Sequence, residues 1–228
     1  MSKISFNKDF YIYSTHKTST QSLKSIFDTV HIHKLSNVQY TKDEFLENVQ
    51  RYYKKNNKKI KILTTLRIPS QRVISSYFQL YHSREVERFK KRSNQTTVMK
   101  NTIEHLVNDI KDFIQEKKYP TESLYEIMSI FDFNFNDIKV NKMKHYGFYE
   151  NNWIELYILD FDSIIGKNRM KYLENIFRIK LMNKSANKSE NKPYYEKYKK
   201  VKEIIGDKFD ELVNSDHVDL ISLKKEFY

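Results

Sequence analysis

Two similar segments constrain the fold of this chain more than any other feature of its sequence. Tyr11–Leu23 and Leu63–Phe78 are separated by 39 residues, and each begins with a short apolar and β-branched run. A turn rich in hydroxyls and cations follows, and then apolar residues recur at helical spacing. Each segment is therefore predicted to be a buried strand, a turn and a helix. One such turn can bind a phosphate, and two on neighbouring strands would hold a ligand with anionic groups at both ends.

The rest of the chain continues the alternation of strands and helices. Further strands are expected at Val30–Leu35 and Trp153–Asp160, and a capping box at Thr41–Glu44 predicts the start of a helix. Such alternation favours parallel pairing with right-handed crossovers. We therefore expect an α/β, three-layer fold with a central, mostly parallel sheet flanked by helices. The 228 residues are expected to form a single domain with mobile loops at 83–101 and 180–192.

Composition excludes several classes of protein. The chain has only three glycines and contains neither of the glycine-rich phosphate-binding motifs, which argues against ATPases and dinucleotide dehydrogenases of those types. It has no cysteine, and therefore no disulfide or thiolate metal site. No apolar run has the length of a signal peptide or a membrane span, so a cytoplasmic protein is expected. The net charge of +12 attracts anionic partners.

The two segments resemble the nucleotide-binding elements of sulfotransferases that use PAPS (3′-phosphoadenosine 5′-phosphosulfate). The most similar members are glycan sulfotransferases of the heparan 2-O and bacterial capsule types. The resemblance implies their P-loop-NTPase-like fold. It also implies that Arg67, with Ser75 eight residues later, binds the 3′-phosphate. The residues implied to bind the 5′-phosphosulfate are Lys17, Thr18, Ser19, Thr20, Gln21 and Ser22.

Three histidines are candidates for the acceptor side of such a site. His31 and His33 would share one face of a strand, because side chains alternate between faces. The resemblance implies that His33 is the general base and that His31 contacts the substrate. His16, directly before Lys17, is a rival for contact with the acceptor. Two other interpretations stay open: satisfied polar groups at a strand end, or a metal pair, which the lack of an obvious third ligand disfavours.

A late basic stretch is the last candidate element. Asn187–Tyr198 resembles a degenerate form of a signature in the capsule enzymes, which implies that Lys188 and Lys192 cover the nucleotide. A solvated loop of lysine and asparagine explains the same residues equally well.

Together these features predict a sulfotransferase that moves the sulfuryl group of PAPS to a hydroxyl of a cell-surface or capsular polysaccharide, leaving PAP. Lys17 would stabilise the leaving phosphate, with no metal required. The basic charge suits an acidic glycan and leaves peripheral membrane contact open, while the oligomeric state is not predicted. Nucleic acid is not the expected partner, although a basic nucleic-acid-binding protein is one alternative. The other is an ATP-dependent phosphotransferase that uses the Lys17 loop with Asp160 or Asp162 on magnesium.

Overall fold

The described part of the chain divides into two compact units. The computed structural model describes residues 6–14, 20–33, 35, 40–78, 103–115, 122–181, 196, 198–204, 213 and 217–228. The first unit takes its residues from 1–67, 121–187 and 219–228, and the second from 68–120 and 188–218. The expected single domain stays a prediction.

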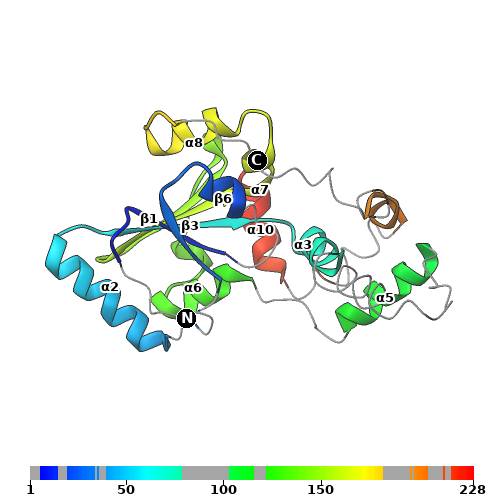
Figure 1. The fold of residues 1–228 in the computed structure, drawn as a ribbon, viewed down its shortest axis with the longest axis horizontal. Helices are drawn as coiled ribbons and strands as arrows, with labels where there is room; N and C mark the ends of the chain where they lie inside the picture. Colours follow the sequence, from blue (N-terminus) through cyan, green and yellow to red (C-terminus); the bar gives the residue numbers. More distant parts are fainter. Residues whose placement is uncertain are drawn as a thin grey trace, which may run out of the picture. The chain divides into compact units, whose positions relative to one another are not determined.

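A six-stranded sheet forms the centre of the first unit (Figure 1). The strand order is β2-β1-β3-β6-β5-β4. The first four strands in this order are parallel, whereas β5 and β4 are antiparallel. The strands are β1 (Phe10–Tyr13), β2 (Thr29–Ile32), β3 (Ile60–Leu66), β4 (Lys139–Asn141), β5 (Tyr146–Glu150) and β6 (Ile154–Asp160). The expected α/β fold with a mostly parallel sheet is confirmed, and the antiparallel edge is an addition to it.

Helices cover both faces of this sheet. Alternate side chains of β1 enter different hydrophobic clusters, with Tyr11 and Tyr13 in one and Ile12 in the other. The Tyr11 cluster includes residues of α2 (Lys42–Asn56), α6 (Ser123–Phe131) and α10 (Val218–Glu226). The Ile12 cluster includes residues of α1 (Thr20–Lys24), α7 (Phe161–Ile165) and α8 (Arg169–Phe177). Figure 1 shows α8 and α6 on opposite sides of the strands, so this unit has three layers.

Local signals explain where several of these elements begin. The Thr41 hydroxyl accepts a hydrogen bond from the Glu44 amide at 3.1 Å, and the Glu44 carboxylate accepts one from the Thr41 amide at 2.9 Å. This is the predicted capping box at the start of α2.

In β5, Gly147 is packed so closely that an added Cβ would lie 3.0 Å from Ile138 and 3.4 Å from Ile158. Two short single-turn helices, η3 (Phe135–Asp137) and η4 (Lys142–Lys144), flank β4.

The second unit is helical where it is described. It contains α3 (Pro69–Ser76), α5 (Ile103–Gln115) and a helical stretch at 198–204. Pro69 occupies the first turn of α3, as its missing amide hydrogen predicts. The core of this unit is formed by side chains such as Val73, Tyr77, Leu106, Ile110 and Val201. The expected loop at 83–101 and positions 182–192 of the second expected loop lie outside the described residues.

Candidate functional site

The two motif-bearing segments lie on neighbouring parallel strands. β1 pairs with β3 in register Tyr11 to Ile62, and with β2 on its other side. Ser14, His33 and Arg67 each directly follow one of these three strands. The carboxyl ends of all three strands therefore meet at one edge of the sheet, which is where open α/β sheets bind their ligands.

The hydroxyl-rich turn after β1 is described only in its second half. Thr20 is the first residue of α1, Gln21 is exposed and Ser22 is partly buried. The carbonyl of Ser22 accepts a hydrogen bond from the Ser25 hydroxyl at 2.8 Å. Six other predicted site residues lie outside the described part of the chain, and their roles stay predictions: His16, Lys17, Thr18, Ser19, Lys188 and Lys192.

Arg67 is held at the end of β3 by packing against an aromatic ring. Its side chain is only 8% exposed, which does not fit an ordinary surface ion pair. The guanidinium carbon lies 4.3 Å from the centre of the Phe161 ring, within the range of a cation–π contact. Phe161 begins α7, directly after β6, and β6 pairs with β3 so that Leu66 faces Asp160. The neighbouring strand therefore restricts the orientation of this guanidinium.

Ser75, the expected partner of Arg67, belongs to the second unit. It lies on α3 and its side chain is partly buried. Arg72 on the same helix is fully buried, which favours a structural role over ligand binding. The joint action of Arg67 and Ser75 on one phosphate stays a prediction.

The histidine pair lies at the end of β2 and contacts Ser14, which directly follows β1. The rings of His31 and His33 have centroids 3.9 Å apart at an interplanar angle of 63°, so both point to the predicted common side. His31 Nε2 lies 3.0 Å from the Ser14 carbonyl oxygen and 3.1 Å from the Ser14 hydroxyl. Because a carbonyl oxygen only accepts, the hydrogen of neutral His31 sits on Nε2. His31 on β2 is therefore bound to Ser14, which follows β1 in the segment that contains Lys17.

The environment of His33 keeps its imidazole neutral. Burial lowers the pKa of His33 below its usual value, and the positive charge of Lys24 lowers it further, against a hydrogen bond with the Ser14 backbone that raises it. A neutral imidazole at pH 7 can accept a proton, which is the property that a general base needs.

Asp160, one of the two candidate magnesium ligands, is instead a structural group. Its carboxylate is fully buried and accepts hydrogen bonds from the Ser163 amide at 2.8 Å, the Ser163 hydroxyl at 2.7 Å and the Tyr228 hydroxyl at 2.9 Å. Lys224 forms an ion pair with Asp160 and a second one with Asp162 at 2.9 Å. Burial raises the pKa of Asp160, but the hydrogen bonds from Lys224 and Ser163 outweigh it, so the pKa lies below the usual value.

Four donors thus engage the Asp160 carboxylate, three of them on Oδ2 and Lys224 on Oδ1. A metal ion would have to displace Lys224 or the cap of α7 to bind it. No group of three or more histidine or acidic side chains that could hold a metal ion occurs among the residues that the structure describes.

Sequence reasoning missed Ser14, Phe161 and Lys224. Ser14 lies at the end of a predicted strand, so its position was implied but its contacts with the histidines were not. Lys224 is 64 residues from Asp160, and no local pattern connects the two positions.

Comparisons with known proteins identify no relative of this chain. No protein-family model matches the chain, and neither the curated proteins nor the solved structures contain a significant match. Within the described ranges, no helix combines the length and the apolar character needed to cross a membrane.

Proposed function

We propose that this chain is a PAPS-dependent sulfotransferase that transfers the sulfuryl group to a hydroxyl of a glycan, within a P-loop-NTPase-like sulfotransferase fold. One observation carries the proposal. The two segments that resemble phosphate-binding elements follow adjacent parallel strands, and a histidine pair lies against the end of the first of them.

The spacing of the strands suits a ligand with two anionic groups. Adjacent strands lie about 5 Å apart, so the segments after β1 and β3 begin within the length of one nucleotide. Arg67 supplies a guanidinium that can form a bidentate contact with phosphate, and Phe161 restricts its orientation. In this proposal Lys17 and the following hydroxyls bind the 5′-phosphosulfate, while Arg67 and Ser75 bind the 3′-phosphate.

The proposed reaction is a single in-line displacement. The acceptor oxygen forms a bond to sulfur while the bond from sulfur to the bridging phosphate oxygen breaks. His33 takes the proton of the acceptor hydroxyl, and PAP leaves with the negative charge that Lys17 stabilises. His31 has its Nε2 hydrogen directed at Ser14 and packs against the His33 ring, so we assign it a positioning role.

The state of Asp160 argues against this residue as the magnesium ligand of the ATP-dependent alternative and leaves Asp162, whose side chain is 52% exposed and pairs with Lys224, as its candidate. A magnesium-dependent phosphotransferase needs an accessible carboxylate near the phosphate groups. Asp160 has no exposed surface and is engaged by Lys224, Ser163 and Tyr228. Transfer from PAPS needs no such ligand.

A transfer assay with radiolabelled PAPS and a panel of polysaccharides tests the proposal. We expect label to enter a glycan in the presence of a magnesium chelator. Transfer from labelled ATP but not from PAPS would contradict it. The remaining alternative is a nucleic-acid-binding protein. Adding nucleic acid as a competitor tests it, because such a protein would bind the nucleic acid in preference to PAPS.

A further inference from the structure

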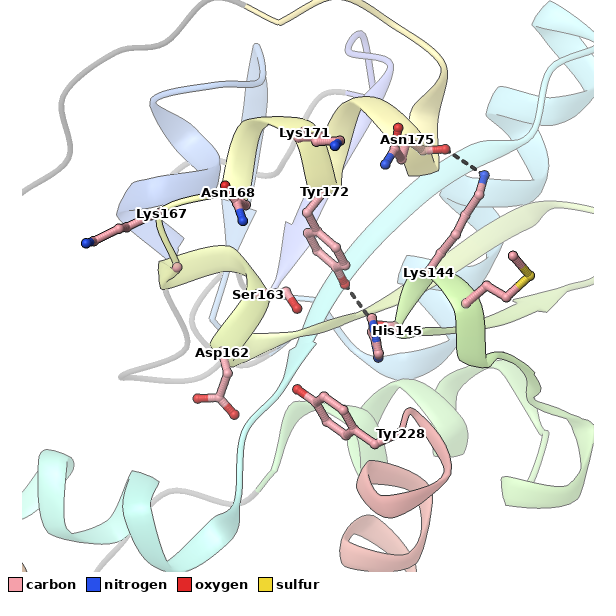
Figure 2. Close-up of a pocket in the computed structure, with 12 residues that line it drawn as sticks. Lys144, His145, Asp162, Ser163, Lys167, Asn168, Lys171, Tyr172, Asn175 and Tyr228 are labelled. Atoms are coloured by element: carbon pink, nitrogen blue, oxygen red, sulfur yellow. Dashed lines mark hydrogen bonds between the residues drawn. The ribbon is translucent and has the colours of Figure 1, made fainter.

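A cavity lies at the same edge of the sheet, beside β6 rather than beside β1. It has a volume of about 410 Å³ and is lined by residues of η4, α7 and α8 together with Tyr228 (Figure 2). β6 is two strands from β1 in the sheet order, which corresponds to about 10 Å along the edge. None of its described lining residues is one of those proposed to bind phosphate.

Hydrogen bonds between separate elements build the walls of this cavity. The Lys144 ammonium donates to the Asn175 carbonyl at 2.6 Å, which joins η4 to α8. The Tyr172 hydroxyl donates to the His145 carbonyl at 2.9 Å, and it accepts from the Asp160 amide at the same distance. Figure 2 shows the Lys144 and Tyr172 bonds spanning the space between the two elements. These hydrogen bonds hold the walls of the cavity together.

The cavity carries an excess of positive charge. Lys144, Lys167 and Lys171 line it together with a single carboxylate, Asp162, and that carboxylate is paired with Lys224 at 2.9 Å. Lys167 and Lys171 are exposed, and neither makes a hydrogen bond or an ion pair with any residue in the described ranges. Two ammonium groups are therefore available to an anionic ligand.

We propose that this cavity binds a sugar unit that carries a carboxylate or a phosphate. The volume is at the lower end of ligand pockets, which suits a single sugar or a disaccharide. Lys167 and Lys171 would bind the anionic group, and the side-chain amides of Asn168 and Asn175 can bind sugar hydroxyls. The aromatic ring of Tyr228 adds an apolar surface on which the face of the sugar ring can pack. This site goes beyond the proposed function and does not depend on PAPS binding.

Methyl NMR of the nucleotide-free protein tests this site. Met143 lines the cavity and is 94% exposed, so its methyl group, assigned with Met143→Leu, reports ligand binding there. The probes are glucuronate, glucose 1-phosphate and neutral glucose. The site variant is Lys167→Ala with Lys171→Ala, and the matched control is Lys42→Ala with Lys54→Ala on α2. The control removes the same charge from exposed positions outside the cavity.

We expect glucuronate, glucose 1-phosphate or both to shift the Met143 signal in a saturable way, with glucose at least about tenfold weaker. The anion that binds more tightly identifies the ligand class. The site variant should weaken binding about tenfold, and the control should not. Lys171→Gln serves as a milder variant if the double variant is unstable. Equal binding of glucose, an equal loss in the control, or no Met143 shift would overturn the proposal.

Discussion

The ends of β6 and β2 carry polar clusters of opposite kinds at one edge of the same sheet. Asp160, at the end of β6, is fully buried and receives hydrogen bonds from Ser163 and Tyr228 in addition to the Lys224 ion pair. His31 and His33, at the end of β2, are only partly buried, and His31 contacts Ser14, which directly follows β1. The first cluster holds α7 and α10 to the sheet, and the second leaves an imidazole that can still exchange a proton.

This difference indicates which of the two strand ends is available for chemistry, namely the end of β2 rather than the end of β6. A buried carboxylate that is held by an ion pair and hydrogen bonds contributes to stability only as long as these partners stay in place. A partly buried histidine with a lowered pKa is neutral and accessible at pH 7. We therefore expect substitutions at the β6 end to change stability, and substitutions at the β2 end to change activity.

Removing Lys224 should have the largest effect on stability. Lys224→Met leaves Asp160 buried without its cation, which costs about 3–5 kcal/mol when one partner of a buried pair is lost. Denaturant unfolding followed by circular dichroism measures this loss. A second variant that also carries Asp160→Asn should recover part of it, because no uncompensated charge remains. A change below about 1 kcal/mol would mean that the pair is solvated and that the comparison is wrong.

If His33 is the general base of the proposed sulfuryl transfer, His33→Asn should reduce that transfer at least about 100-fold, because a general base contributes that much or more. Titration with PAP should show unchanged nucleotide affinity, since the residue acts on the acceptor. His31→Asn should retain more activity than His33→Asn, as expected of a positioning residue. If both variants lose binding of PAP to the same degree, the histidines support the nucleotide site instead.

The two clusters should also differ in their pH dependence. The pKa of His33 is lowered in the folded state, so the unfolded chain binds the proton first, and stability falls as the pH drops below about 6.5. The pKa of Asp160 is lowered from 3.8, so its contribution is present above that value and is lost as the pH falls through the folded pKa. Unfolding free energies at several pH values should show both windows. His33→Asn removes the first window alone, and Asp160→Asn the second alone.

The smallest effect is expected for an exposed ion pair far from both clusters. Lys59 lies 3.1 Å from Glu150, and both side chains are about a third or more exposed. Lys59→Met should cost roughly 0.5 kcal/mol, because solvent screens such pairs. This variant is the control for Lys224→Met, since both remove one lysine of an ion pair. A similar loss in the two variants would remove the distinction between buried and exposed pairs.

The strands with continuous apolar runs could be predicted from the sequence. β6 begins one residue later than expected and ends where expected, because its Ile, Leu and Tyr side chains pack on both faces of a central strand. β4 has only three residues, Lys139–Asn141, and carries no such run. It pairs with β5, so its formation depends on contact with that strand, which is a tertiary effect. α10 was likewise not predicted, because its helical face is short and its packing partners are distant in sequence.

The candidate site was predictable in outline and not in its contacts. The similarity of the two segments indicated paired binding turns, and alternation placed His31 and His33 on one side. The contacts of Ser14, Phe161 and Lys224 join residues from different strands and helices, so local periodicity contains no information on them. The cavity beside β6 depends in the same way on η4 and α8 meeting.

The central claim is that the carboxyl ends of β1 and β3 form a site for two phosphate groups. Calorimetric titration with PAP, AMP and ATP in the absence of magnesium tests it most directly. We expect micromolar binding of PAP with AMP at least about tenfold weaker, a difference near 1.4 kcal/mol, and loss of that preference in Arg67→Ala. Equal affinity for PAP, AMP and ATP in the unaltered protein would contradict the claim.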